Sequence, residues 1–286
     1  MTVVRSTPRI AAVIGSPVVH SLSPVIHQAA FDAAGVAWTY TAFEIAPGQA
    51  EAALRSMRVL RLAGLSVTMP HKSDVARLVD RLDPAARALD SVNTVSWDGD
   101  DLVGSSTDGA GFVASLVDAG VDVGDARVAV IGAGGAARSV IDALSRVGVR
   151  SISVLNRTPD RAEQAATLAR TASVGIESDI SRADIVVNAT SVGMGVEVAS
   201  SGPDDLPCDP ALLRAGQVVA DLVYHPLETA WMSAATAVGA RTVDGLGMLV
   251  HQAALQQHAW IGHRPDTSAM RAAAVAELAA RQNTAR

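Results

Sequence analysis

The stretch Val128-Ala-Val-Ile-Gly132-Ala-Gly134-Gly135-Ala-Ala137 decides the fold class. Its apolar start predicts a buried strand, its glycines predict a tight turn, and the residues after them predict a helix. In a G-x-G-x-x-A pattern, Gly132 permits the turn, Gly134 permits close approach of a pyrophosphate, and Ala137 permits the helix to pack on the strand. The pyrophosphate would lie at the helix N-terminus, where free N–H groups and the helix dipole favour an anion. We therefore predict a dinucleotide site, in preference to a purely structural glycine turn.

The end of the next predicted strand indicates which dinucleotide binds. An NAD site has Asp or Glu there to hold the ribose 2′-hydroxyl, whereas this sequence has Asn156-Arg157-Thr158, followed by Arg161. The two arginines can hold a 2′-phosphate, and Asn156 and Thr158 can add neutral hydrogen bonds. Charge-assisted hydrogen bonds contribute about 1.5–3 kcal/mol each, so two of them favour NADP over NAD by about a hundredfold or more. The alternative is that both arginines are solvated surface residues.

Short β-rich runs alternate with helical patterns on both sides of this stretch, which predicts an α/β fold with mostly parallel sheets. In the first half we expect strands at residues 9–14, 39–44, 65–67, 92–97 and 102–105, and helices near residues 24–34, 48–62 and 73–79. In the second half we expect strands at residues 127–131, 151–155, 185–188, 218–222 and 242–244, and helices at residues 135–146, 160–169 and 229–238. Residues 198–210 are loop-like, and the tail from about residue 246 to residue 281 is helical and Ala-rich.

The composition sets broad limits on the function. The length of 286 residues favours two domains, with boundaries near Asp108 and Gly245, and the 49% of hydrophobic residues is enough for a sizeable core. A net charge of −6 argues against a nucleic-acid partner. The single cysteine, Cys208, excludes a disulfide framework and fits a reducing compartment. No apolar run is long enough to span a membrane, and the N-terminus reads as a strand instead of a signal peptide, so we expect a soluble, cytoplasmic protein.

One basic residue differs in kind from the others. Of the 23 lysines and arginines, only Lys72 is a lysine. Arginine-biased composition explains the arginines but not the lysine. Lysine can release a proton near neutral pH when its surroundings shift its pKa, whereas arginine cannot. Lys72 is therefore a candidate for proton transfer, against the alternative of a leftover surface lysine.

Three polar clusters in the first half are candidates for a reaction site. Ser21 and Ser23 precede a predicted helix, where two hydroxyls suit a small carboxylate, although Ser23 could equally be the helix N-cap. The segment Ser66-Val-Thr68-Met-Pro-His71-Lys72 leads from a strand to the lysine, and His71 reads as a helix-start residue. The third cluster is Ser91-Val-Asn93-Thr94 with Ser106-Thr-Asp108-Gly109, in which Asp108 can cap the next helix and also take part in catalysis.

Hydride transfer between NADP and an alcohol/ketone pair requires one proton to move as well. Lys72 and Asp108 form a plausible acid/base pair for that proton, which is typically worth 10²–10⁴-fold in rate. The sequence has no His-x-x-x-His, no cysteine cluster and no carboxylate-rich metal motif. We therefore predict no catalytic metal.

Together these motifs match one known family. The chain resembles shikimate dehydrogenase over nearly its whole length. The first matching segments are Gly15-Ser-Pro, His20-Ser-Leu-Ser-Pro with His27, Val67-Thr-Met-Pro-His-Lys72, Val92-Asn-Thr94 and Ser106-Thr-Asp-Gly109. The others are Gly132-Ala-Gly-Gly-Ala-Ala-Arg138, Asn156-Arg-Thr-Pro-Asp-Arg161, Asn188-Ala-Thr-Ser191 with Gly193-Met194, Asp221-Leu-Val-Tyr-His-Pro226 and Gly245-Leu-Gly-Met-Leu-Val-His-Gln252.

The resemblance implies NADP-dependent, reversible reduction of 3-dehydroshikimate to shikimate, a step of aromatic amino acid (chorismate) biosynthesis. It implies that Lys72 and Asp108 are the catalytic pair. The substrate-binding residues would be Ser21, Ser23, Thr68, Lys72, Asn93, Asp108, Tyr224 and Gln252, of which Ser21 and Ser23 hold the carboxylate. The cofactor-binding residues would be Gly132, Ala133, Gly134, Gly135, Ala136, Asn156, Arg157, Thr158, Arg161, Asn188, Ala189, Thr190, Leu222 and Gly245.

The resemblance also implies an architecture. A substrate domain of residues 1–107 and 245–286 would be split by a Rossmann-type NADP-binding domain of residues 108–244. The expected partner is a small-molecule substrate, with no nucleic acid and no membrane, and the protein would be a monomer or a homodimer.

Three positions depart from the usual family pattern and bear on substrate choice. Gln28, Ser66 and Ser106 each stand where the family commonly has Asn. The nearest alternative is therefore a sister enzyme that acts on quinate or aminoshikimate. In the family, Thr at the position of Ser23 accompanies quinate use and an Asp-ended second strand accompanies NAD use, so both features here favour shikimate and NADP. A non-catalytic NADP-binding paralogue would have lost Lys72 or Asp108, and both are present.

Overall fold

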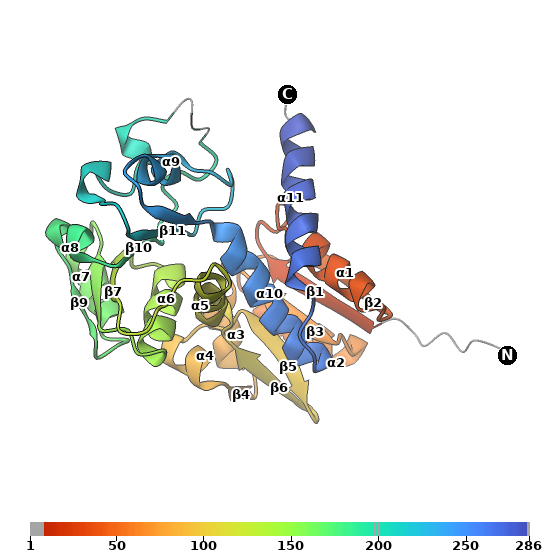
Figure 1. Ribbon diagram of the computed structural model, residues 1–286. Coiled ribbons are helices and arrows are strands. Elements are labelled where there is room, and N and C mark those ends of the chain that lie inside the picture. The colour runs from red at the N-terminus through yellow and green to blue at the C-terminus, as the bar shows by residue number, and fades with distance from the viewer. Residues whose placement is uncertain (1–8, 197, 199–200, 285–286) are drawn as a thin grey trace. The chain divides into compact units, whose positions relative to one another are not determined.

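The computed structural model describes residues 9–196, 198 and 201–284 (Figure 1). Contacts between Cα atoms divide the chain into two compact units. The first unit consists of residues 1–107 and 252–286, and the second of residues 108–251. Helix α10 (Gly245–Ile261) therefore contributes residues to both units.

The first unit is built on a six-stranded sheet with the order β2-β1-β3-β5-β6-β4. Strand β5 runs antiparallel to its neighbours β3 and β6, whereas the other pairs in this sheet are parallel. The strands are β1 (Arg9–Gly15), β2 (Trp38–Glu44), β3 (Gly64–Val67), β4 (Arg81–Leu82), β5 (Thr94–Asp98) and β6 (Asp101–Ser105).

The interior strand β1 is apolar on both faces, as expected for a strand covered on both sides. Ala12 and Ile14 pack in a cluster with α2 (Ala50–Leu60) and α3 (Lys72–Leu78). Ala11 and Val13 pack in a second cluster with Phe31, Tyr40 and Trp260. These aromatic residues come from α1 (Ser23–Ala33), β2 and α10, and the indole N–H of Trp260 donates to the carbonyl of Val95 at 3.1 Å. The unit also contains α4 (Pro84–Leu89) and α11 (Thr267–Thr284).

A side chain pairs with the edge strand β2 of this sheet. The Gln28 amide, on α1, donates to the carbonyl of Trp38 at 3.2 Å, and its oxygen accepts from the backbone N–H of Tyr40 at 3.1 Å. Gln28 thus makes the two hydrogen bonds that another strand would make at this point.

The second unit contains a fully parallel six-stranded sheet with the order β12-β11-β10-β7-β8-β9. Chain order reverses between β7 and β10, which is the topological switch point of a doubly wound dinucleotide fold. The strands are β7 (Arg127–Ile131), β8 (Ser151–Leu155), β9 (Ala172–Val174), β10 (Ile185–Asn188), β11 (Val218–Asp221) and β12 (Arg241–Val243). Its other helices are α5 (Asp108–Asp118), α6 (Gly135–Arg146), α7 (Pro159–Ala166), α8 (Glu177–Arg182) and α9 (Ala230–Ala237).

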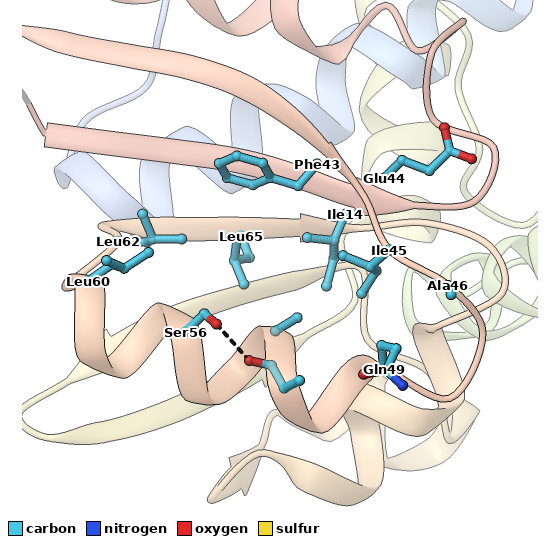
Figure 2. A pocket seen from close by; sticks show the side chains of 12 residues that line it. Ile14, Phe43, Glu44, Ile45, Ala46, Gln49, Ser56, Leu60, Leu62 and Leu65 are labelled. Carbon is cyan, nitrogen blue, oxygen red and sulfur yellow. Dashed lines mark hydrogen bonds between the residues drawn. The ribbon is translucent and has the colours of Figure 1, made fainter.

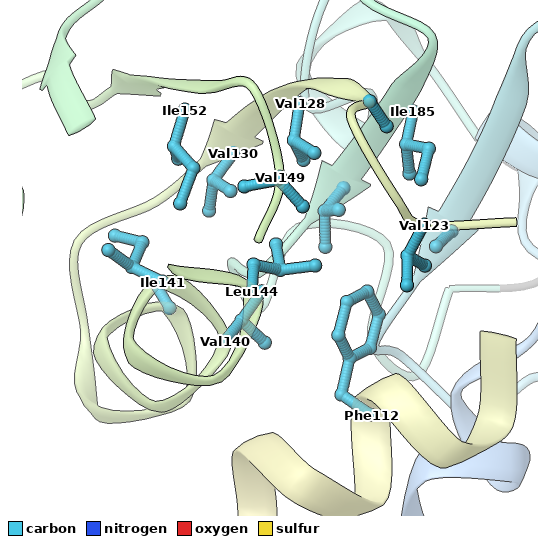
Figure 3. Packing of buried hydrophobic residues seen from close by; sticks show 14 of the residues in the cluster. Phe112, Val123, Val128, Val130, Val140, Ile141, Leu144, Val149, Ile152 and Ile185 are labelled. Carbon is cyan, nitrogen blue, oxygen red and sulfur yellow. The ribbon is translucent and has the colours of Figure 1, made fainter. Parts of the chain in front are cut away.

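The main core of this unit lies between the sheet and helices α5 and α6 (Figure 3). Val140, Ile141 and Leu144 of α6 are fully buried in the same cluster as Val128 and Val130 of β7. This packing fixes where α6 begins relative to the end of β7, and hence the position of the glycine turn between them.

The α/β class and the mostly parallel sheets are confirmed, and nearly all expected strands and helices are present. The sequence pattern did not predict β4, α4, β9 and α8, because elements of two to six residues are too short to show a period. Of the predicted loop at residues 198–210, residues 199–200 lie outside the described residues, and Pro203–Asp205 and Pro210–Leu212 form 3₁₀ turns. Among the described helices, none combines the length and apolarity that crossing a membrane requires.

Candidate active site

The glycine turn after β7 has the backbone geometry that the fingerprint requires. Gly132 has φ +116°, a region that L side chains rarely adopt, and its N–H donates to the carbonyl of Leu155 at 2.7 Å. A Cβ atom at Gly132 would lie 2.9 Å from the carbonyl oxygen of Ala189. The turn therefore packs against the segment after β10, which brings two of the predicted cofactor segments together.

The N-terminus of α6 is open to a ligand. Gly134, Gly135 and Ala136 are exposed, and a Cβ atom at either glycine would meet no atom within 4 Å. The N-cap residue of α6 is Gly134, so its N-cap has no side chain that could bond to the first N–H groups. The first turn of α6 also contains no acidic residue. By contrast, Ala137 is fully buried against the strand. The helix therefore presents backbone N–H groups and the positive end of its dipole at a surface that a phosphate can approach.

The end of β8 presents cationic groups. Arg157, Thr158 and Arg161 are exposed, and the Asn156 amide donates to the carbonyl of Thr158 at 2.9 Å, which stabilises the turn into α7. Asn156 and Arg157 line a pocket of about 710 Å³ that also includes Ile131 and Leu155. The pocket therefore lies at the carboxyl ends of β7 and β8, beside the glycine turn.

Cys208 lines the same pocket but has the properties of an inert thiol. It is half-buried, and burial raises the pKa of its thiol to about 11. Thiolate is the reactive form, so this cysteine stays protonated and unreactive at neutral pH.

A buried hydrogen-bond network shapes the segment after β10. The oxygen of the Asn188 amide accepts from the backbone N–H and the hydroxyl of Thr190, at 3.0 and 2.7 Å. The amide nitrogen of Asn188 donates to Asp221 at 2.9 Å. Asp221 also accepts from the hydroxyl of Thr229 at 2.7 Å and from the N–H of Val223 at 3.0 Å. Asn188, Ala189 and Thr190 are therefore held in one conformation beside Gly132.

Asp221 was not among the predicted site residues. It is almost fully buried, and burial raises the pKa of its carboxyl, although the three hydrogen bonds favour the charged form. The signal that could have identified it is its position as a carboxylate at the end of an apolar strand. Next to it, a Cβ atom at Gly245 would lie 2.4 Å from the carbonyl oxygen of Leu222, so the structure brings these two predicted cofactor residues together. Tyr224 follows on the same loop and is half-buried.

Neither Ser21 nor Ser23 is the N-cap residue of helix α1. Helix α1 is capped by Leu22 without a side-chain hydrogen bond, so the alternative in which Ser23 is the N-cap is wrong. Instead, the N–H of Ser23 donates to the hydroxyl oxygen of Ser21 at 3.1 Å. Both serines are half-buried, and the Ser21 hydroxyl lies beside the backbone N–H of Ser23.

Thr68 and Lys72 follow β3. The N–H of Thr68 donates to the carbonyl of Ile14 at 2.9 Å, and Lys72 is the first residue of α3. Both side chains are half-buried. His71 occupies the N-cap position and is buried, with Nε2 at 3.0 Å from the carbonyl oxygen of Ile45, so it is a helix-start residue as predicted.

Asn93 is the centre of a second buried network in the first unit. Its amide oxygen accepts from the N–H of Thr107 at 2.9 Å. Its amide nitrogen donates to the Thr107 hydroxyl at 2.9 Å and lies 3.4 Å from the side-chain oxygen of Gln252. Thr107 in turn donates to the backbone carbonyl of Gln252 at 3.1 Å. The structure therefore brings the predicted substrate residues Asn93 and Gln252 together, and Thr107 is a supporting residue that the prediction missed.

Asp108 is the first residue of α5, not its N-cap, and a carboxylate in that first turn is stabilised by the helix dipole. Lys72 belongs to the first unit and Asp108 to the second, so their pairing stays a prediction. In the described part of the chain, no cluster of three or more His, Cys, Asp or Glu side chains is arranged to hold a metal ion.

A further pocket in the first unit is of a different kind. It measures about 470 Å³ and contains none of the predicted substrate residues. Figure 2 shows Ile14, Leu62 and Leu65 of the sheet region facing helix α2 across it. Its mostly apolar wall does not suit a hydroxylated acid, so the substrate site is to be sought at the polar networks described above.

Comparison with known proteins identifies the family. Residues 13–95 match the shikimate dehydrogenase substrate binding domain, residues 115–196 match shikimate/quinate 5-dehydrogenase, and residues 245–275 match the shikimate 5′-dehydrogenase C-terminal domain. The shikimate dehydrogenase (NADP(+)) of Moorella thermoacetica is 40% identical over 94% of each chain, and that of Symbiobacterium thermophilum is 42% identical over 96% of each chain. The chain belongs to the shikimate dehydrogenase family. The resemblance inferred from the motifs is thereby confirmed.

Solved structures of the shikimate dehydrogenase family have the same fold. A shikimate dehydrogenase in complex with NADP+ superimposes with a TM-score of 0.88 at 32% identity, covering 95% of this chain and 96% of that one. The enzyme of Thermus thermophilus in complex with NADP(H) and shikimate gives 0.84 at 34% identity, covering 93% and 98%. A quinate dehydrogenase of Corynebacterium glutamicum in complex with NAD gives 0.86 at 32% identity, covering 94% and 99%. Fold alone therefore does not distinguish shikimate from quinate enzymes.

Proposed function

We propose that this chain is an NADP-dependent shikimate dehydrogenase, which reversibly reduces 3-dehydroshikimate to shikimate. The observation that carries the proposal is the match to curated relatives of that name at 40 and 42% identity over 94 and 96% of the chain. Because the match spans both units, it includes the residues that we assign to the cofactor and those that we assign to the substrate. The reaction belongs to aromatic amino acid biosynthesis, and the partner is a small molecule.

The second unit fits NADP by the chemistry of its surface. The open N-terminus of α6, from Gly134 to Ala136, would hold the pyrophosphate with backbone N–H groups. Arg157 and Arg161 would hold the 2′-phosphate with charge-assisted hydrogen bonds, with Asn156 and Thr158 beside them. The remaining contacts come from Gly132, Ala133, Asn188, Ala189, Thr190, Leu222 and Gly245. When bound, NADP supplies or accepts the hydride.

The first unit offers hydroxyl and amide groups for a hydroxylated acid. Ser21 and Ser23 would donate to the carboxylate. Thr68, Asn93 and Gln252 would bind the ring hydroxyls or the carboxylate, together with Tyr224 of the second unit. Asn93 and Gln252 are already ordered by Thr107, so little conformational entropy is lost when the ring binds.

Lys72 and Asp108 would manage the proton. Reduction of the carbonyl requires a proton on the oxygen that becomes the alcohol, and oxidation requires its removal. Lys72 is half-buried and can release and regain a proton, whereas the neighbouring His71 is fully buried, with Nε2 at 3.0 Å from the carbonyl oxygen of Ile45. A carboxylate at Asp108 would orient the ammonium group and stabilise its charge.

The domain assignment follows from the same proposal. Residues 1–107 and 245–286 would form the substrate domain, and residues 108–244 the NADP domain. We place the enzyme in the cytoplasm, as a monomer or a homodimer.

The test is the change of nicotinamide absorbance with purified protein, shikimate or quinate, and NADP or NAD. We expect fast turnover with shikimate and NADP. Lys72→Ala should lower kcat by about 10²–10⁴-fold while NADP binding is retained, and Arg77→Ala, on the exposed side of the same helix, should change kcat by less than about twofold. Preference for quinate or NAD would assign the chain to the sister enzymes. Tight NADP binding without turnover of any cyclic polyol acid would indicate a non-catalytic paralogue.

A further inference from the structure

The loop between β1 and α1, which carries Ser21, is held at its start by backbone contacts. The N–H of Ser16 donates to the carbonyl of Met69 at 2.9 Å. A Cβ atom at Gly15 would lie 2.3 Å from Cγ2 of Thr68, so the two chain segments are in direct contact there. The start of the loop is therefore fixed against the segment that follows β3.

The middle of the same loop is exposed and is held by a side chain from the far end of the chain. Val19 is 72% exposed, and His20 is exposed as well. Nη1 of Arg281, on α11, donates to the backbone carbonyl of His20 at 2.8 Å. Nε of Arg281 donates to Oε1 of Glu277, one helical turn earlier, at 2.7 Å. A guanidinium carries several donors in one rigid plane, so a single side chain makes both bonds.

The sequence of α11 directs Arg281 toward this loop. Helix α11 packs on α1, and its buried residues Met270, Ala274 and Leu278 recur every four positions. Residues three or four apart share one side of a helix, so Arg281 extends this buried side by one further position. Arg281 also lies in the last turn of α11, where the helix dipole favours a cation.

The peptide group between His20 and Ser21 is held on both of its sides. Its carbonyl accepts from Arg281, and its N–H donates to the carbonyl of Val18 at 3.0 Å. Because a peptide group is planar, these two bonds fix the backbone that leads into Ser21. Oγ of Ser21 then accepts from the N–H of Ser23 at 3.1 Å. This bond uses a lone pair of the hydroxyl and leaves its proton to donate to a ligand.

We propose that Arg281 is a positioning residue for the substrate, because it fixes the peptide group before Ser21 and so keeps Ser21 and Ser23 in the arrangement that binds a carboxylate. The proposal rests on the proposed function, in which these two serines hold the carboxylate of the acid. Without the guanidinium, the exposed peptide group gains conformational freedom, and binding must order it again.

The same argument states which kinetic constant should change. The carboxylate keeps its charge during hydride transfer, so its contacts with the serines are equally strong in the ground state and in the transition state. Loss of such uniform binding raises KM and leaves kcat unchanged. Arg281 belongs to the first unit, so binding of NADP to the second unit should not depend on it.

The test is Arg281→Met, which keeps an unbranched stem and removes the donors. We expect the KM for shikimate to rise by roughly three- to tenfold, the effect of losing one hydrogen bond. The kcat and the KM for NADP should stay within about twofold. Arg281→Lys, which retains a charge and a donor, should recover part of the lost affinity. Arg271→Met, an exposed change on the same helix, is the matched control and should leave all three constants unchanged.

Two further measurements separate positioning from a structural role. With the analogue of shikimate in which a methyl group replaces the carboxylate, Arg281→Met and the wild type should have the same kcat/KM. Glu277→Ala should raise the KM for shikimate no more than Arg281→Met does. Added to Arg281→Met, it should have no further effect on this KM, since Glu277 acts through the guanidinium.

Four outcomes would overturn the proposal. The first is an unchanged KM for shikimate in a folded Arg281→Met enzyme. The second is a parallel loss of kcat and of affinity for NADP together with a lower thermal midpoint, which would make Arg281 a structural residue. The third is an equal loss with the methyl analogue, which would exclude an effect through the carboxylate. These three leave the proposed function standing, whereas a wild-type protein that binds NADP but does not oxidise shikimate would refute that function and this proposal with it.

Discussion

At the scale of single residues, selection between NADP and NAD depends on a few atoms at the end of β8. The two cofactors differ by one phosphate. The Asn156 amide is engaged with the carbonyl of Thr158 at 2.9 Å and stabilises the turn, whereas Arg157 and Arg161 extend into solvent. The turn and the charges are therefore separable, and the arginines can be changed without disturbing the fold.

The double variant Arg157→Ala/Arg161→Ala should lose selectivity for NADP. We expect the KM for NADP to rise by about 10- to 100-fold and the KM for NAD to change less than about threefold, because NAD has no 2′-phosphate to lose contact with. Steady-state rates with both cofactors give the ratio. Arg170→Ala, an exposed arginine elsewhere in the second unit, is the control. An equal effect on both cofactors, or none, would mean that the arginines are only solvated surface residues.

The residues that could be predicted are those whose role is visible in a short segment. The glycines of the turn belong to a G-x-G-x-x-A motif, and Lys72 is the only lysine in the sequence. Thr107 and Asp221 could not be found in this way, because residues that they contact are distant in sequence. Thr107, for example, joins Asn93 to Gln252, and only the folded chain brings these positions together.

At the scale of elements, the β7–α6 turn combines two different demands on glycine. Gly132 is needed for the backbone, since its φ is +116° and a Cβ atom would lie 2.9 Å from the Ala189 carbonyl oxygen. Gly134 has an ordinary φ, −77°, and a Cβ atom there would meet nothing within 4 Å. The fold itself therefore does not require glycine at position 134. The absence of a side chain there fits the close approach of a pyrophosphate.

Alanine at these two glycines should have opposite consequences. Gly132→Ala should lower the free energy of unfolding by about 1–3 kcal/mol, because a strained backbone conformation is forced on an L residue. Gly134→Ala should leave the free energy of unfolding within about 0.5 kcal/mol of wild type, while NADP binding weakens. Urea unfolding and NADP titration measure the two effects. A destabilised Gly134→Ala protein, or one that binds NADP normally, would contradict this interpretation of the turn.

The helices and strands that the sequence pattern did not predict are all short, and other interactions define them. Helix α4 is six residues long and is defined by its cap, in which Asp83 accepts from the N–H of Ala86 at 2.6 Å. Strands β4 and β9 contain two and three residues and exist because a neighbouring strand pairs with them. Such elements depend on a local hydrogen bond or a distant partner, neither of which leaves a hydrophobic period in the sequence.

At the scale of the whole molecule, stability should fall with mild acid because of one buried imidazole. The pKa of His27 is about 3 in the folded protein and 6.5 when unperturbed. Between pH 3 and pH 6.5, His27 is therefore protonated in the unfolded chain and neutral in the native state. Above pH 6.5, protonation of His27 does not reduce the free energy of unfolding. As the pH falls from 6.5 toward 3, the free energy of unfolding decreases progressively. Asp184, whose pKa Arg127 lowers to about 2, adds a loss only below about pH 4.

Between pH 7 and pH 5 we expect the free energy of unfolding to fall by about 2 kcal/mol through His27. His27→Asn should be less stable at pH 7, yet its free energy of unfolding should change little over the same range. Urea unfolding at the two pH values measures this difference. A variant as pH-sensitive as the wild type would place the acid sensitivity in another group.

The split of the first unit along the chain has a consequence for biosynthesis. Trp260, which shares a buried cluster with Phe31 and Tyr40, leaves the ribosome only after the whole second unit has been made. At 5–20 residues per second, the nascent first unit waits roughly 7–30 s for that partner. During this interval the apolar surface of β1 and β2 lacks its indole cover. We therefore expect ribosome-associated chaperones to bind this exposed apolar surface of the nascent chain until translation ends.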